Sequence, residues 1–267
     1  MRGILPSMPL GAVKRLGRFA VERARAYGKI VQIAWGCARA LASLSFANRA
    51  VFPVILRQFY FTAVQALPLV LFSALVVGSI SVHYILQILT DLVGAYELVG
   101  TLLIHAVLHE IAPILCTMIL LVRSGTAVIS EVSLMKINRE LDTLEHLGID
   151  LDHYVHFPRV AAFILAGPSL TLIFSVVSLV GSFLIFGFRY NITFGLYLDE
   201  LYAALTLKSL LIVVAKPFLM SAVMILTALQ KAMDVEAAFT EVPVRLIQGL
   251  IRALGIIIVV ELFFALL

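Results

Sequence analysis

Charged residues are scarce in this chain of 267 residues. Asp, Glu, Lys and Arg together make up 13% of the sequence and 62% of the residues are hydrophobic, whereas soluble globular domains contain about 25% charged residues. So few charges cannot cover a water-facing surface of this size without leaving large apolar patches exposed. The composition therefore excludes a soluble enzyme, a disordered protein and a disulfide scaffold, and it predicts an integral membrane protein.

Cysteines are few and the common catalytic motifs are missing. The two cysteines, Cys37 and Cys116, lie far apart among apolar residues and predict neither a disulfide framework nor a cysteine-based metal site. No G-x-x-x-x-G-K-[ST], G-x-S-x-G or H-E-x-x-H motif occurs, so the chain has no P-loop of its own for a nucleotide. We expect this chain to provide no catalytic residue and to bind no metal, cofactor or nucleic acid.

Two groups of histidines are candidate metal ligands. His105 and His109 are one helical turn apart, with Glu110 next in the chain. Only two of these ligands would face the same way, so a hydrogen-bonded packing pair is the favoured alternative. A second, looser group is expected to be solvated and consists of His146, Asp150, His153 and His156.

Positive charge is concentrated in the first part of the chain. Residues 1–57 contain ten Lys or Arg and a single acid, Glu22, which gives this segment a net charge of +9. Because the net charge of the whole chain is +4, the net charge of residues 58–267 is −5. The positive-inside rule places this basic segment on the cytoplasmic side. Within residues 10–34, apolar side chains recur at helical spacing opposite basic ones, which predicts an amphipathic helix lying in the membrane interface. A cytosolic helix packed on the rest of the protein is the alternative.

Long apolar runs dominate residues 58–267, which we predict to be the membrane domain. A span needs about 20 apolar residues, and the predicted spans are 63–90, 98–122, 160–188, 209–230 and 246–266. Five crossings place the two ends of this domain on opposite sides of the membrane. The polar segments 123–159 and 231–245 then share the cytoplasmic side and contain six Lys or Arg, against two in 91–97 and 189–208, as the positive-inside rule requires. The predicted fold class is an all-α integral membrane protein.

Two acidic residues lie inside the predicted spans. Glu110 and Glu261 are flanked by apolar residues, where a carboxylate is costly unless it is paired, protonated or turned toward a wet cavity. We therefore expect both to belong to a functional site, and structural pairing is the competing interpretation. The candidate partners are Arg252, Lys216 and Arg123.

The polar segment between the second and third spans contains a further pattern. Residues 131–147 place apolar side chains at helical spacing among charges, and Gly148 follows. This pattern predicts an amphipathic helix that ends at a glycine cap. Its apolar side needs a groove, which a partner protein or the spans of the chain itself could supply.

The region from His109 to Arg159 resembles the signature region of MlaE-type permeases, the membrane subunits of MCE-associated lipid ABC transporters. The family pattern reads approximately R-E-L-G-P, G-R-x-G-[ST]-A, E-[IL]-G-x-M-[KR], M-G-[VI]-D-P and P-R. The matching stretches are H-E-I-A-P at 109–113, V-R-S-G at 122–125, E-V-S-L-M-K at 131–136, L-D-T-L-E at 141–145, G-I-D at 148–150 and F-P-R at 157–159. The chain departs from the pattern at His109, where the family has Arg, and at Ala112 and Ser133, where it has Gly.

The resemblance implies a homodimeric permease of the bacterial inner membrane with a cytoplasmic N-terminus. It would move phospholipid or a related lipid between that membrane and an MCE-domain carrier, and so help to maintain outer-membrane lipid asymmetry. A separate ABC ATPase would bind ATP and Mg, and the first and fifth spans would line the lipid cavity. The implied ATPase-coupling residues are Glu131, Met135, Lys136, Leu141, Leu144 and Glu145. The implied lipid-path or gating residues are Glu110, Pro113, Arg123 and Glu261.

Two other classes of protein remain as alternatives. An ion- or proton-coupled secondary transporter would use Glu110 and Glu261 as a proton relay and would need no ATPase. A membrane-embedded assembly factor would transport nothing. An ATPase that purifies with the chain would favour the ABC permease over both the secondary transporter and the assembly factor.

Overall fold

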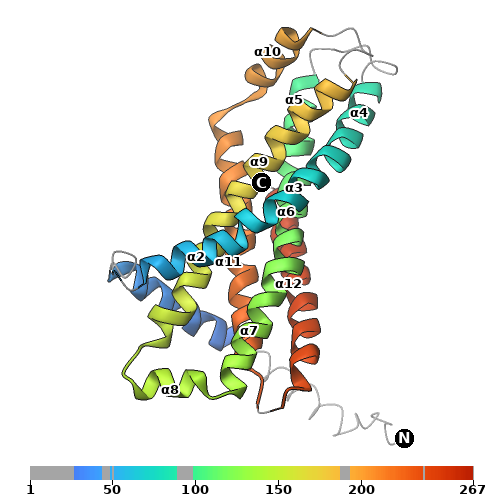
Figure 1. Cartoon of the computed structure of the whole chain (residues 1–267). Coiled ribbons are helices and arrows are strands. Elements are labelled where there is room, and N and C mark those ends of the chain that lie inside the picture. The colour runs from blue at the N-terminus through green and yellow to red at the C-terminus, as the bar shows by residue number, and fades with distance from the viewer. Residues whose placement is uncertain are drawn as a thin grey trace, which may run out of the picture.

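The computed structural model describes residues 27–43, 49, 51–88, 99–186, 193–236 and 238–266. These residues form helices joined by turns and contain no strand. Five helical segments are long and apolar enough to cross a membrane, and Figure 1 shows them as an elongated bundle with α8 near one end and α5 and α10 at the other. The prediction of an all-α membrane protein with about five spans is confirmed.

The first two spans are interrupted helices. The first span, Phe52–Ile85, contains α2 (Phe52–Thr62), α3 (Leu67–Ser73) and α4 (Ser79–Ile88), joined by a 3-10 turn (Val64–Ala66) and a π-helical turn (Ala74–Gly78). The second span, Gly100–Ile137, contains α5 (Val99–Leu103), α6 (Ala112–Leu120) and α7 (Thr126–Ile137), joined by π-helical turns at Ile104–Ile111 and Leu121–Gly125. Such turns often mark functional sites in helices.

The last three spans are more regular. The third, Asp152–Gly181, begins with a π-helical turn (Asp152–His156) and continues as α9 (Phe157–Phe186). The fourth and fifth spans are α11 (Leu207–Met233) and α12 (Glu241–Ala265), and the short α10 (Phe194–Ala204) lies between the third and fourth. Burial raises the pKa of Tyr197 in α10, whose hydroxyl donates to the Leu179 carbonyl at 3.2 Å and so fastens α10 to α9.

The segment 131–147 is not the single helix that its sequence pattern predicts. The second span continues through α7 to Ile137, the chain turns at Asn138 and Arg139, and a separate helix, α8, covers Glu140–His146. Arg139 has a left-handed backbone conformation with φ of 58°, which ends one helix before the next begins. The prediction of one helix is therefore wrong, because a short turn interrupts an amphipathic pattern that is continuous in the sequence.

The predicted glycine cap after this segment is confirmed. Gly148 has φ of 76°, a conformation that suits glycine because it has no Cβ. Its N–H donates to the Glu145 carbonyl, and the N–H of Ile149 donates to the Leu144 carbonyl. These two hydrogen bonds form a Schellman motif, which satisfies carbonyls that the end of α8 would otherwise leave open.

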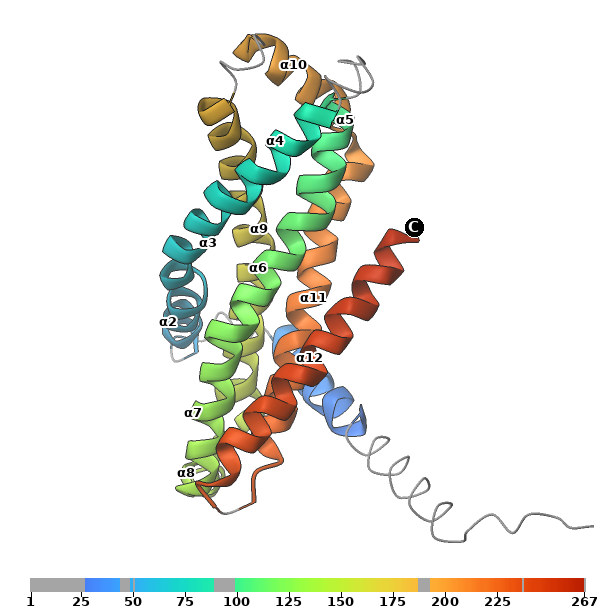
Figure 2. The same ribbon diagram turned by 90° about the vertical axis from the view of Figure 1, so that its right-hand side faces the viewer.

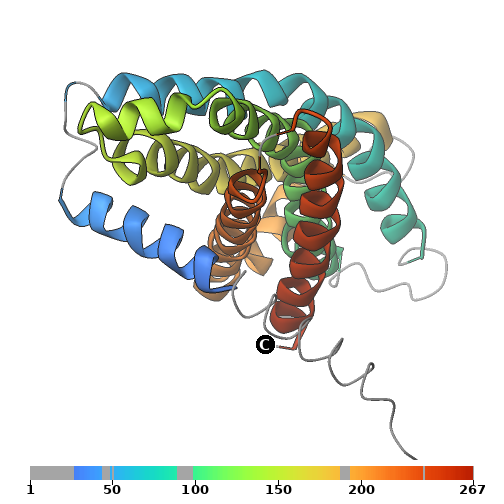
Figure 3. The ribbon, with the colours of Figure 1, turned by 90° about the horizontal axis from the view of Figure 1, so that it is seen from below.

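The predicted interfacial helix at residues 10–34 lies partly outside the described residues, which begin at residue 27. A helix over residues 27–42 lies across the end of the bundle that bears α8, as Figure 3 shows. Lys29, expected to face anionic lipid headgroups, forms an ion pair with Asp234 at 2.7 Å. Cys37 of this helix is buried without a disulfide, and burial and the Asp152 carboxylate raise the pKa of its thiol to about 12.

The core of the bundle lies where α9 and α11 pack against the other spans. Phe163, Phe174 and Leu170 of α9 and Met220 and Met224 of α11 are among its fully buried side chains. Because lipid tails are as apolar as these residues, close packing rather than exclusion from water stabilises such contacts within the membrane. The core thus fixes the positions of the polar groups that the spans bring together.

The fifth span is the least enclosed. Only 17% of the 18-residue apolar stretch of α12 is buried, whereas 33–50% of the corresponding stretch is buried in the other four spans. Its buried side faces α7 and α11: a Cβ at Gly249 would lie 2.7 Å from Ile129 Cδ1, so the small residue permits this close approach. Figure 2 shows the C-terminal part of α12 leaving the bundle, which leaves a long apolar face without a partner in the described residues.

Candidate functional site

Three spans meet at one buried lysine. Lys216 of α11 is 1% exposed, and its Nζ donates to Glu261 Oε1 of α12 at 2.6 Å and to Glu110 Oε2 of the second span at 3.2 Å. A charged group at membrane depth is tolerated when such partners surround it. Of the three candidate partners, Lys216, Arg123 and Arg252, Lys216 is the one paired with both acids among the described residues.

Pro113 explains the third contact of this lysine. Proline has no N–H and cannot bond the carbonyl four residues earlier, which here belongs to His109. Lys216 Nζ donates to that carbonyl at 2.6 Å. In a membrane each freed backbone group needs an internal partner, so the proline, the π-helical turn at Ile104–Ile111 and the lysine form one local arrangement, which we call the Lys216 cluster.

The histidines next to this cluster contact Ser209 and each other. His109 Nε2 lies 2.7 Å from Ser209 Oγ, and the His105 and His109 rings meet edge to face with centroids 5.4 Å apart. In the second histidine group the expectation of a solvated loop is wrong for His156. That residue is 5% exposed, and its Nδ1 lies 2.9 Å from Asp152 Oδ1.

The Lys216 cluster can act as a lock between spans. Two carboxylates from different helices share one ammonium group, so their charges hold α11, α12 and the second span in one arrangement. Breaking a buried pair leaves an uncompensated charge and typically costs about 3–5 kcal/mol. A movement of α12 relative to α11 would therefore have to break the ion pair between Lys216 and Glu261 and provide new partners for both groups.

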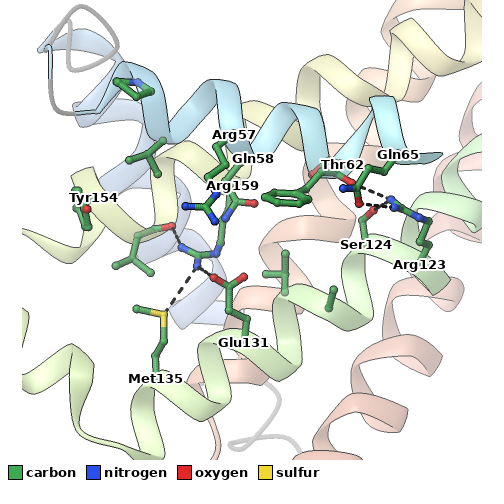
Figure 4. Close-up of a pocket in the computed structure, with 16 residues that line it drawn as sticks. Arg57, Gln58, Thr62, Gln65, Arg123, Ser124, Glu131, Met135, Tyr154 and Arg159 are labelled. Atoms are coloured by element: carbon green, nitrogen blue, oxygen red, sulfur yellow. Dashed lines mark hydrogen bonds and ion pairs between the residues drawn. The ribbon is translucent and has the colours of Figure 1, made fainter. Parts of the chain in front are cut away.

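A second polar feature lies closer to the end of the bundle that bears α8. A cavity of about 770 Å³ lies between α2, the end of the second span and the start of the third and is open on one side. Figure 4 shows side chains from all three pointing toward it. Its lining includes Pro53, Val54, Arg57, Gln58, Phe61, Thr62, Gln65, Arg123, Ser124, Ala127, Val128, Glu131, Met135, Tyr154, Val155 and Arg159. We call this space the arginine cavity.

Arg159 is the most deeply buried charge of the arginine cavity. It is 5% exposed, and its guanidinium donates to Glu131 Oε1 at 2.7 Å and to the Val155 carbonyl at 2.8 Å. Its Nε is buried and has no hydrogen-bond partner among the described residues. Glu131 is more open, with a side chain 52% exposed, so the pair is buried on one side only.

The other two arginines of the cavity have no carboxylate partner within 4.0 Å among the described residues. Arg123 donates to the Phe61 carbonyl at 2.8 Å and to Gln65 Oε1 at 3.0 Å. Arg57 lies over the Phe61 ring, 5.6 Å from its centroid. With three arginines and one glutamate in its lining, the cavity has a formal excess of two positive charges.

The structure separates the residues that the sequence analysis grouped. Glu131 and Met135 line the arginine cavity, Lys136 Nζ donates to the Met233 carbonyl at 2.5 Å, and Leu141 is 3% exposed. Leu144 is half-buried and Glu145 is exposed. Arg123 lies in the arginine cavity rather than with Glu110, Pro113 and Glu261.

The arginine cavity is not predicted by the sequence patterns. Arg159 belongs to the P-R stretch, and Arg57 is one of many basic residues near the N-terminus. Their separation along the chain gives no local pattern, and only the contact of α2 with α9 brings them together. A signal was nevertheless present, because an arginine inside or beside a span is expected to have a partner or a ligand.

Comparison with known proteins gives a consistent result. A model of the family described as "Permease MlaE" matches residues 55–267, which include all five spans except the first three residues of α2. The chain is 26% identical over 178 residues to the intermembrane phospholipid transport system permease protein MlaE of Haemophilus influenzae, a match that covers 67% of the chain and 66% of that protein. It therefore spans slightly less than two thirds of that relative's length.

Two further relatives come from other lineages. A probable ABC transporter permease protein of Rickettsia bellii is 24% identical over 197 residues, covering 72% of the chain and 73% of the relative. The chloroplastic protein TRIGALACTOSYLDIACYLGLYCEROL 1 of Arabidopsis thaliana is 32% identical over 112 residues, covering 42% of the chain and 32% of the relative. The resemblance thus extends across bacterial and plastid proteins.

Proposed function

The chain belongs to the MlaE permease family, and from this membership we propose that it is the permease subunit of an ABC transporter that moves phospholipid or a related lipid. The observation that carries the proposal is the family match over residues 55–267, which extends through the five spans. The chain contains no P-loop motif, so a separate ATPase would supply the energy.

The end of the bundle that bears α8 is the proposed docking surface for that ATPase. On this segment Leu147 is 70% exposed and Glu145 is exposed, whereas Leu141 faces the protein. Contact with a partner would bury Leu147 and use the exposed charges around it for specificity. This assignment places α8 in the cytoplasm, and the basic N-terminal region on the same side satisfies the positive-inside rule.

A second copy of the chain is proposed to cover the exposed side of α12. Ile251, Ile258 and Leu262 are each at least 60% exposed there. A homodimer would supply the two membrane halves that the resemblance implies, with a lipid path between them. An MCE-domain protein on the other side of the bacterial inner membrane would exchange lipid with that path.

The Lys216 cluster would couple the movement of α12 to this path. ATP binding and hydrolysis in the partner would alternate the arrangement of the spans, and exchange of the lysine contacts would define two discrete states. Glu261, on the least enclosed span, is proposed to border the lipid path. Glu110, held by the same lysine next to Pro113, is proposed to maintain the gate.

Reconstitution with the cognate ATPase tests the proposed function. The purified pair would be placed in liposomes with fluorescent phospholipid, and transfer to an MCE-domain acceptor would be followed with ATP, without ATP and with a proton gradient alone. We expect transfer that requires ATP hydrolysis. Transfer driven by the gradient alone would instead identify a secondary transporter, and failure of the ATPase to bind the chain would contradict the permease assignment.

A further inference from the structure

We infer that the arginine cavity is a binding site for the phosphate group of a membrane phospholipid. The inference rests on the proposed function and makes it more specific, because it names the part of the lipid that the chain recognises and the residues that do so. It concerns a space within one copy of the chain, formed by α2, α7 and the start of the third span, and not the path proposed between two copies.

The charge of the cavity indicates an anionic ligand. Three arginines face one glutamate in the lining, and Arg57 and Arg123 have no carboxylate partner within 4.0 Å among the described residues. Unpaired cations in or beside membrane spans are costly. A ligand with negative charge would compensate them, and the planar guanidinium group matches the oxygen atoms of a phosphate well.

The unsatisfied donor of Arg159 indicates where such a ligand would bind. Arg159 is 5% exposed, and its buried Nε has no partner among the described residues. A buried donor without an acceptor costs about 1–3 kcal/mol. A phosphate oxygen at this position would remove that cost, and exposed Glu131, which now holds the other side of the guanidinium, could turn outward to admit it.

The position of the cavity indicates that the phosphate belongs to a lipid. The cavity extends along α2 and along residues 123–135 of the second span, and it reaches the ends of the spans. There its lining includes Met135, two residues before α7 ends, and Tyr154 and Arg159 on either side of the start of α9. Headgroups occupy this layer, because the polar regions extend the roughly 30 Å hydrocarbon core to about 40–45 Å. The lining also includes Pro53, Val54 and Val128, which suit the glycerol and the first acyl carbons, and Phe52 and Leu56 of α2 are exposed beside it.

The first experiment reports ligand entry without changing an arginine. Ala127 is an exposed residue of the lining, so Ala127→Cys provides a thiol that a maleimide can label in the purified full chain after delipidation. Wild-type protein measures the background from Cys37 and Cys116, both buried. We expect phosphatidylglycerol to slow labelling at least about fivefold, and diacylglycerol with the same acyl chains or inorganic phosphate at equal concentration to have no effect.

Each other outcome of this labelling contradicts the inference. Equal protection by diacylglycerol would show that the space accepts any apolar chain and does not recognise phosphate. Protection by inorganic phosphate alone would overturn the lipid as the source of the ligand. Labelling that no probe slows would show that the cavity binds neither.

Substitutions then test the residues, with lipid affinity measured on the purified chain. Arg159→Gln should weaken phosphatidylglycerol binding about tenfold or more, the equivalent of 1.4 kcal/mol. Glu131→Gln keeps the shape and removes the competing anion, so it should strengthen binding severalfold, a gain that misfolding cannot produce. Arg39→Gln is the matched control, because the Arg39 side chain is 66% exposed and lies outside the cavity lining. Among the described residues its one ion pair is with Asp152, at 3.9 Å.

The outcomes separate this site from the proposed function. Lipid binding is measured without an ATPase and therefore does not depend on the proposed function. If Arg159→Gln and Glu131→Gln both bind lipid like the wild type while the wild-type complex transports lipid, the site is wrong and the proposed function stands. A chain that binds lipid as expected but supports no ATP-driven transfer would leave the site standing and contradict the function. Weaker binding by Glu131→Gln would contradict the proposed competition between Glu131 and the phosphate.

Discussion

The Lys216 cluster and the arginine cavity solve the problem of charge in a membrane protein in opposite ways. In the cluster one ammonium group, 1% exposed, is shared by two carboxylates and a backbone carbonyl. In the cavity only Arg159 of the three arginines is paired with the single carboxylate, Glu131, and the buried Nε of Arg159 has no partner among the described residues. The first arrangement surrounds its buried cation with acids and suits a structural lock, although Glu261 Oε2 is also buried with no partner among the described residues. The second has surplus positive charge and suits a ligand.

The comparison predicts that removal of Lys216 has the largest effect on stability. Lys216→Met leaves the two partly buried acids Glu110 and Glu261 without their cation, and loss of one partner of a fully buried pair costs about 3–5 kcal/mol, which sets the upper value here. We expect a large fall in the midpoint of thermal unfolding in detergent. The matched control is Lys208→Met, because Lys208 is an exposed lysine of the same helix.

A combined variant sharpens this prediction. Lys216→Met together with Glu110→Gln and Glu261→Gln removes the unpaired charges as well as the cation, so it should recover part of the lost stability. If Lys216→Met unfolds at the temperature of the control, the cluster does not lock the spans. If the combined variant is less stable than Lys216→Met alone, charge is not the cause of the loss.

Glu261→Gln is expected to have an intermediate effect. The side chain keeps its shape and its oxygen can still accept from Lys216, while Glu110 remains as the charged partner, so we expect a cost of about 1 kcal/mol and an assembled complex. ATP-driven lipid transfer should nevertheless fall, because the variant removes one of the two carboxylate charges that pair with Lys216 and that are proposed to change partners when the spans move. Glu110→Leu, which loses both the charge and the hydrogen bond, should instead destabilise the assembly.

The control for Glu261→Gln lies on the same helix. Glu241 is a partly exposed acid of α12, paired at 3.8 Å with Arg245, so Glu241→Gln changes the same functional group outside the cluster. Lipid transfer by Glu261→Gln at the wild-type rate would exclude a role for this acid in the path. A matching fall in transfer with Glu241→Gln would show that any acid of α12 has the same effect.

These two regions also show what the sequence could predict. The five spans follow from hydropathy alone, and Glu110 and Glu261 were identified because a carboxylate in an apolar run is costly. Their common partner could not be deduced, since it depends on the packing of α11 against α12 and the second span. The arginine cavity was missed for the same reason, because it unites residues from three segments that are far apart in the sequence.

The break between α7 and α8 illustrates a different limit. The amphipathic pattern of residues 131–147 continues without a glycine or proline, so Asn138, a residue type that favours turns, is the one weak local signal for the turn at Asn138 and Arg139. Tertiary contacts determine it: Lys136 is held by the Met233 carbonyl and Leu141 is buried against the protein. By contrast Gly148, where a positive φ requires a residue without a Cβ, was predicted correctly from its position alone.

Arg123→Gln is expected to have the smallest effect on stability. Arg123 is only partly buried and contacts the Phe61 carbonyl and the Gln65 side chain. No carboxylate is stranded when it is removed, and relief of repulsion among the three cationic side chains offsets part of the lost hydrogen bonding. We expect a change of at most about 1 kcal/mol in the free energy of unfolding, measured by thermal unfolding beside Arg39→Gln. A loss as large as that of Lys216→Met would mean that Arg123 holds α2 against the second span, and the contrast between an ion-paired lock and an open cationic site would then be wrong.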